Sequence, residues 1–137
     1  MRLRHLLPIL LLPLASPRLE AAAQWGIDQH KLLSAIGAVE GNPWKRPGGL
    51  YGYTPATWAQ YSTLPYRHAQ NPVKAKETAF LIILETCHRL ERDGIRPTPY
   101  LIALRWRWGY EGMKKRLKTQ SDYAKRVTNL YLDPTFR

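Results

Sequence analysis

Apolar residues recur every three to four positions along most of the chain beyond residue 24, and no segment alternates apolar with polar residues as a half-buried strand does. Such a spacing places apolar side chains on one face of a helix. This spacing, together with cap residues, predicts five helical segments: residues 29–40, 55–61, 72–93, 99–109 and 122–133. We therefore predict an all-α domain of about five to six helices.

Cap residues mark where these helices begin and end. The five segments are preceded by side chains that accept hydrogen bonds from a first helical turn: Asp28, Thr54, Asn71, Thr98 and Ser121. Proline directly follows three of these residues, and it suits the first helical position because its missing N–H needs no partner there. Gly41 and Gly94 are predicted to end the first and third helices. The polar, proline-containing stretch 62–70 is predicted to be a loop.

The third segment, residues 72–93, is predicted to be the central helix. It is the longest of the five, and residues 80–84 are apolar on nearly every side of the helix. A helix that is apolar all round is covered by its neighbours. Its predicted core stripe consists of Ala79, Ile82, Ile83, Thr86 and Leu90.

The first 23 residues have the layout of a secretory signal peptide. Arg2 and Arg4 give a basic start, an apolar run follows at residues 6–15, and three alanines end the stretch at residues 21–23. The apolar run is too short for a membrane-spanning helix. We predict cleavage after residue 23, export to the periplasm or the extracellular space, and a mature domain of residues 24–137.

The chain is strongly basic, with a formal net charge of +11 and a sequence pI of about 10.1. Six basic residues lie in its C-terminal third: Lys114, Lys115, Arg116, Lys118, Lys125 and Arg126. Two interpretations stay open, a solvated basic face or a surface that attracts an anionic cell-wall polymer or a membrane. We exclude nucleic acid as a partner because the protein is predicted to be exported and carries no nucleic-acid-binding motif.

Cysteine and histidine predict no redox or metal chemistry. Cys87 is the only cysteine, so the chain cannot form an internal disulfide, and its apolar helical surroundings predict a buried thiol. His30, His68 and His88 are scattered without metal-ligand spacing. We therefore predict no metal and no cofactor.

Glu40 is the principal candidate for a catalytic residue. It shares a helical stripe with Leu33 and Ile36, and no other Asp or Glu occurs between Glu40 and Glu77. The spacing directs its carboxyl group towards a partly apolar cleft, and a carboxyl group kept protonated there can serve as a general acid. The alternative is an exposed glutamate at a helix end.

Aromatic residues cluster in two stretches of the sequence, one just after Glu40 and one near the end of another predicted helix. Tyr51 and Tyr53 follow Glu40 in a glycine-rich loop, and Tyr110 follows a second glycine near another helix end. Aromatic rings stack on the apolar faces of sugars, so these three tyrosines are candidate substrate-binding residues. Trp58 and Trp106 are assigned to the core.

Three short motifs resemble those of the lysozyme-like, lytic-transglycosylase type of small all-α domain. They are AVEGNP at residues 38–43, GLYGYTPATW at 49–58 and ALRWRWGYEG at 103–112. The ending YAKRVTNLY, at residues 123–131, is also similar to the last helix of that family. The resemblance covers nearly the whole predicted mature chain and implies a lysozyme-like fold. It places the family's catalytic glutamate on Glu40.

The resemblance implies cleavage of the β-1,4 bond between N-acetylmuramic acid and N-acetylglucosamine in peptidoglycan. No second acid follows Glu40 closely, which suits a route assisted by the substrate's own acetamido group better than a two-carboxylate route. The product could carry an anhydro end, as from a lytic transglycosylase, or a hydrated end, as from a lysozyme. Glu85 is a candidate for a second site carboxylate, and a buried ion pair with an arginine is the alternative.

Two family positions carry unexpected residues. The family's glutamine in the second motif falls on Gly52, and its asparagine in the third motif falls on Trp108. These two positions are included among the predicted substrate-binding residues. Their identities also favour an alternative, a catalytically weakened domain that binds peptidoglycan or acts as an adaptor in a wall-remodelling or secretion assembly.

Overall fold

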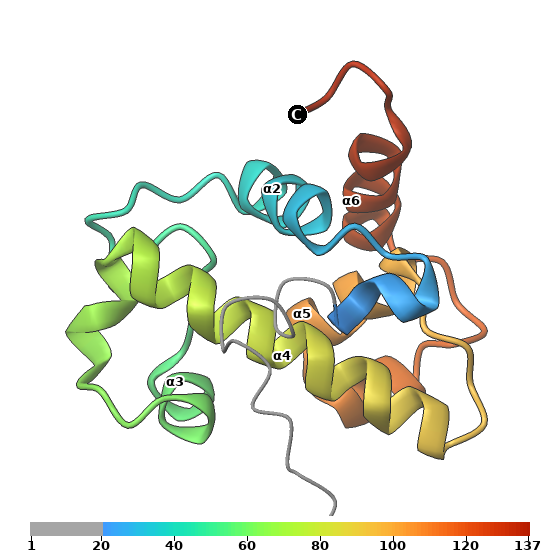
Figure 1. Cartoon of the computed structure of the whole chain (residues 1–137), viewed down its shortest axis with the longest axis horizontal. Helices are drawn as coiled ribbons and strands as arrows, with labels where there is room; N and C mark the ends of the chain where they lie inside the picture. Colours follow the sequence, from blue (N-terminus) through green and yellow to red (C-terminus); the bar gives the residue numbers. More distant parts are fainter. Residues whose placement is uncertain (1–20) are drawn as a thin grey trace, which may run out of the picture.

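The computed structural model describes residues 21–137 and confirms an all-α domain. Within this range the chain forms five α-helices and two short 3-10 helices, with no strand (Figure 1). The elements in chain order are η1 (Ala21–Trp25), α2 (Gln29–Glu40), α3 (Pro55–Tyr61), η2 (Tyr66–Gln70), α4 (Pro72–Arg92), α5 (Pro99–Lys114) and α6 (Asp122–Leu132).

Helix α4 is central, as predicted. It packs against α2, α3, α5 and both 3-10 helices. All five residues of its predicted core stripe are buried: Ala79, Ile82, Ile83, Thr86 and Leu90. The neighbouring helices do not cover α4 on every side, because Leu81 is 38% exposed. Cys87 is fully buried on the same helix, and this burial, followed by the charge of Glu91, raises the pKa of its thiol to about 12.

Helix α6 brings the C-terminal end of the described chain against the first part of the domain. It packs against α2 and α5, and Figure 1 shows α2 and α6 side by side. The Asp28 backbone N–H donates to the Tyr131 hydroxyl at 2.9 Å, and the Lys31 Nζ donates to the Asp133 carbonyl at 2.7 Å. These bonds join residues about a hundred positions apart and hold the C-terminal end of α6 beside the start of α2.

The predicted caps define the helix boundaries. Each of the five predicted N-cap side chains accepts a hydrogen bond from a backbone N–H in its helix: Asp28, Thr54, Asn71, Thr98 and Ser121. Gly41 ends α2 with a left-handed φ of 65°. Helices α4 and α6 end one residue earlier than predicted, and two differences are larger. Helix α5 continues to Lys114 across a kink at Gly109, and the predicted loop 62–70 contains η2.

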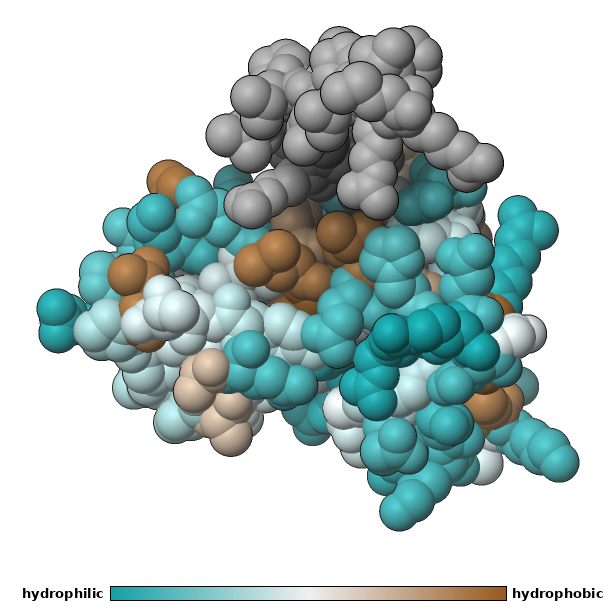
Figure 2. Space-filling model, turned by 60° about the horizontal axis from the view of Figure 1, so that its bottom comes forward, coloured by the Kyte–Doolittle hydropathy of each residue, from teal (hydrophilic) through white to brown (hydrophobic). Residues whose placement is uncertain are grey.

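The predicted signal peptide lies outside the described residues except for its last three positions. There the chain is helical from Ala21 in η1, and Ala22 is fully buried in the core. Within residues 21–137, no helix combines the length and the apolar character needed to span a membrane. On the face shown in Figure 2 the described surface is mostly hydrophilic, and hydrophobic residues gather near its centre.

The central position of α4 leads to a stability prediction. Ile83→Ala should lower the free energy of unfolding by roughly 2–5 kcal/mol, because Ile83 is fully buried and truncation leaves a cavity. Leu81→Ala, in the same helix but 38% exposed, is the control and should cost about 1 kcal/mol or less. Urea unfolding followed by tryptophan fluorescence measures both values. Equal losses would contradict the central role of the buried stripe.

Candidate functional site

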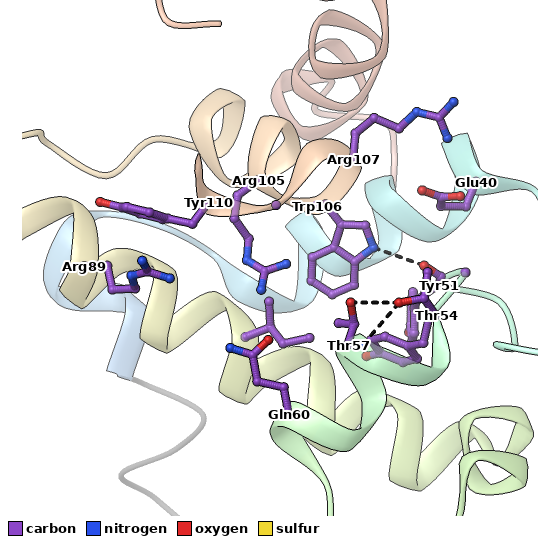
Figure 3. Close-up of a pocket in the computed structure, with 14 residues that line it drawn as sticks. Glu40, Tyr51, Thr54, Thr57, Gln60, Arg89, Arg105, Trp106, Arg107 and Tyr110 are labelled. Atoms are coloured by element: carbon purple, nitrogen blue, oxygen red, sulfur yellow. Dashed lines mark hydrogen bonds between the residues drawn. The ribbon is translucent and has the colours of Figure 1, made fainter. Parts of the chain in front are cut away.

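A cavity of about 350 Å³ lies beside the C-terminal end of α2 and is called the Glu40 cavity below. Its walls come from the end of α2, the loop before α3, and the helices α3, α4 and α5 (Figure 3). The lining residues are Glu40, Tyr51, Gly52, Tyr53, Thr54, Thr57, Gln60, Ile82, Arg89, Arg105, Trp106, Arg107, Gly109 and Tyr110. Four of the five predicted substrate-binding residues are therefore brought together with Glu40.

Glu40 is the last residue of α2 and is half-buried. Its Oε1 accepts a hydrogen bond of 2.8 Å from the hydroxyl of Tyr123 on α6. Burial, followed by the nearby charge of Glu40 and this hydrogen bond, raises the pKa of Tyr123. The phenol therefore stays protonated and remains a donor to Glu40 at neutral pH. Glu40 is also the only carboxylate among the lining residues of its cavity.

Gly52 lets the loop approach the Glu40 carboxylate closely. Its φ is 69°, in the left-handed region that favours glycine. A Cβ atom at this position would lie 3.2 Å from Glu40 Oε2 and 3.2 Å from the Asn42 Nδ2. Any larger side chain would have to compete with the carboxylate for this space. Gly52 thus shapes the cavity through the absence of a side chain.

Tyr51 and Tyr53 line the cavity from its base and are themselves largely buried, each being 4% exposed. Burial raises the pKa of Tyr51 to about 12 and also raises the pKa of Tyr53. The Tyr53 hydroxyl donates to the Ala75 carbonyl of α4 at 2.7 Å, and its ring contacts those of Trp58 and Trp106. These tyrosines hold the loop in place and offer little ring surface to a ligand.

Trp106, which was assigned to the core, lines the Glu40 cavity and is only partly buried. Its Nε1 donates to the Tyr51 carbonyl at 3.1 Å, which fixes the indole ring beside the loop (Figure 3). Trp58 is 1% exposed and belongs to the core, as predicted. Trp108 is not among the lining residues; the Arg116 guanidinium lies 4.7 Å from its ring centroid. The exposed aromatic ring of the site is thus that of Trp106.

Tyr110 and Arg89 lie at the end of the cavity opposite Glu40 in Figure 3. Tyr110 is 6% exposed and donates a hydrogen bond to the Asp93 carboxylate. Burial first, and then this hydrogen bond, raises the pKa of Tyr110 to about 12. The Arg89 guanidinium lies 3.8 Å from the Tyr110 ring centroid, so the ring is covered on one face.

Glu85 is not among the residues that line the Glu40 cavity. Its Oε1 lies 3.8 Å from Arg89 Nη1, and Arg89 Nη2 lies 3.8 Å from Glu111. Glu85 thus pairs with an arginine, but the pair is not buried as the alternative expected, because the Glu85 side chain is 37% exposed. In the part of the chain that the structure describes, no group of three or more His, Cys, Asp or Glu side chains is placed to hold a metal ion.

Comparison with protein-family models, with curated proteins and with solved structures finds no match to this chain. The function of the protein is therefore inferred from the residues of the Glu40 cavity.

The close approach of Gly52 leads to a prediction with a matched control. Gly52→Ala and Gly26→Ala both place a side chain on a left-handed residue, with φ of 69° and 70°, and each should cost roughly 1–2 kcal/mol of stability. Gly26 has open space around its Cβ position, whereas Gly52 has the Glu40 carboxylate. Gly52→Ala should therefore cost about 1 kcal/mol more and should shift the NMR signals of Tyr123. Identical losses and unshifted signals would contradict this arrangement.

The buried tyrosines predict loss of stability at alkaline pH. An unfolded tyrosine has a pKa of about 10, so above this pH the unfolded chain releases protons that Tyr51 and Tyr110, with pKa values of about 12, retain. The free energy of unfolding should then fall from pH 10 towards pH 12, by roughly 1.4 kcal/mol per pH unit for each such group. Tyr51→Phe should remove the contribution of one tyrosine from the slope of unfolding free energy against pH. Urea unfolding at a series of pH values measures this slope. An unchanged slope would contradict the assignment.

Proposed function

We propose that this chain is a peptidoglycan-cleaving glycosidase of the lysozyme-like, lytic-transglycosylase type, with Glu40 as its single general acid and base. The observation that carries the proposal is the environment of Glu40. It is a half-buried carboxylate at the end of α2, it is held by Tyr123, and no other carboxylate of residues 21–137 lines the cavity. The motifs that resemble this family converge on the same cavity from α2, the following loop and α5.

A single acid favours a reaction in which the substrate supplies the nucleophile. Glu40 would donate its proton to the glycosidic oxygen, and the bond from that oxygen to C1 would break as the acetamido oxygen of the same sugar bonds to C1. The carboxylate would then take a proton from a hydroxyl group, whose oxygen attacks C1 and releases the acetamido group. The sugar's own hydroxyl would yield an anhydro end, and water would yield a hydrated end.

The cavity also carries groups suited to a sugar chain. The partly exposed indole of Trp106 offers a surface on which a sugar ring can stack. Thr57 and Gln60 on α3 supply polar side chains that sugar hydroxyls can bind. These groups stand in for the polar residues that the family carries at the positions of Gly52 and Trp108. We further propose that the protein is exported and meets peptidoglycan outside the cytoplasm.

The alternative is a domain that binds peptidoglycan without cleaving it, alone or in a larger assembly. The position of Trp108 favours this alternative, because the residue at the family's asparagine position does not line the cavity. Such a domain would sediment with peptidoglycan and release no fragments.

Glu40→Gln tests the proposal. The variant should keep the fold and lose at least about a hundredfold of the rate of peptidoglycan cleavage, since general acid–base catalysis contributes that much. Glu77→Gln is the control, because Glu77 is exposed on α4 and does not line the cavity. The measurement is mass analysis of the fragments released from purified peptidoglycan, which also separates anhydro from hydrated ends.

Two results would contradict the mechanism. Cleavage that survives in Glu40→Gln at the native rate would remove Glu40 from the reaction. Sedimentation of the native protein with peptidoglycan, with no soluble fragments at all, would favour the binding domain instead.

A further inference from the structure

Arg105 is a buried cation that points into the Glu40 cavity. It lies on α5, one residue before Trp106, and is 8% exposed. In Figure 3 its guanidinium lies between Trp106 and Arg89 and faces the side of the cavity formed by Gln60. It is thus separated from Glu40 by the ring of Trp106 but shares the same cavity.

Within residues 21–137, no carboxylate forms an ion pair with Arg105. Its Nη2 donates a hydrogen bond of 2.9 Å to the Tyr61 hydroxyl, which uses one of five N–H donors. Burial, and then a hydrogen bond to Glu85, raises the pKa of Tyr61. The Tyr61 hydroxyl therefore lies between the Arg105 guanidinium and the Glu85 carboxylate.

The other two arginines of the cavity are different. Arg89 is flanked by the carboxylates of Glu85 and Glu111 and lies over the ring of Tyr110. Arg107 is exposed to solvent, with its guanidinium 5.9 Å from the Tyr123 ring centroid. Neither one combines burial with the absence of an anionic partner as Arg105 does.

A buried charge is costly unless an opposite charge is supplied. The planar fork of a guanidinium matches a carboxylate with two parallel hydrogen bonds. Peptidoglycan contains carboxylates of two sources, the lactyl group of muramic acid where no peptide is attached, and the peptide stem where one is. We propose that Arg105 binds a carboxylate of the glycan substrate within the Glu40 cavity, an inference that rests on the proposed function.

This contact would set the register of the glycan chain in the cavity. One sugar residue would be held at Arg105 through its carboxylate while the bond to be cleaved lies near Glu40. A neutral chain of N-acetylglucosamine would fill the same cavity and lack this contact.

Binding assays in the Glu40→Gln background test the proposal without cleavage. The probes are three oligomers of equal length: a neutral N-acetylglucosamine chain, a peptide-free peptidoglycan chain with lactyl carboxylates, and a chain with peptide stems. Quenching of tryptophan fluorescence, to which Trp106 contributes, reports binding. Arg105→Gln should weaken binding of a carboxylate-bearing chain by about tenfold or more and leave the neutral chain unchanged. Of the two carboxylate-bearing oligomers, the one that loses more affinity identifies the source of the carboxylate.

Two further variants keep the test decisive. Arg105→Lys retains the charge without the fork and should recover part of the affinity, which also guards against a folding defect in Arg105→Gln. Arg67→Gln removes an exposed charge from η2, away from the cavity, and should change no probe's affinity. Equal weakening of all three probes by Arg105→Gln, or no weakening of any, would overturn the proposal.

The proposed function and this inference fail in different assays. Loss of the Arg105 effect on binding would leave the cleavage result for Glu40 intact. Absence of cleavage by the native protein would leave the discrimination between neutral and acidic chains measurable.

Discussion

The hydrogen bond from the Tyr53 hydroxyl to the Ala75 carbonyl fastens the loop before α3 to the central helix. Backbone hydrogen bonds within the loop, such as that from the Tyr53 N–H to the Gly48 carbonyl, set its local shape, and its buried side chains attach it to the helices. Tyr51 adds a second attachment, because its carbonyl accepts from the Trp106 indole on α5. With these two residues held, Gly52 between them can only lie beside Glu40. The shape of the cavity wall therefore depends on tyrosines that scarcely reach its surface.

The helices could be predicted from the sequence because their determinants are local. Cap residues such as Asp28 and Asn71 act within one turn, and the stripe of α4 is visible in the spacing of its apolar residues. The continuation of α5 beyond Gly109 could not be predicted in the same way. Glycine at φ 72° normally ends a helix, and here burial of Tyr110 and Met113 stabilises the helical segment that follows.

The site was predictable in part. Glu40 could be identified as a candidate site residue because α2 positions its side chain and ends at this residue. Trp106 follows the buried Ile102 by four positions, and such a spacing predicts a core residue, so helical spacing alone could not show that its ring lines the cavity. Tyr123 reaches Glu40 across 83 positions of sequence, and no local pattern indicates which helices will pair. The lack of a carboxylate partner for Arg105 is likewise a tertiary property.

The two oxygens of Glu40 have different surroundings, and this difference gives a physical meaning to Gly52. Oε1 accepts the hydrogen bond from Tyr123, which fixes the plane of the carboxyl group. Oε2 lies only 3.2 Å from the point where a Cβ of residue 52 would stand. A glutamine here, as in the family that the motifs resemble, would place its side chain next to that oxygen. Glycine leaves the space beside Oε2 free of a side chain, and under the proposed function polar contacts with a sugar chain would fall to Thr57 and Gln60 on α3. Under the proposed function, this departure from the family pattern would move polar contacts with the substrate to α3 while leaving the carboxylate accessible to it.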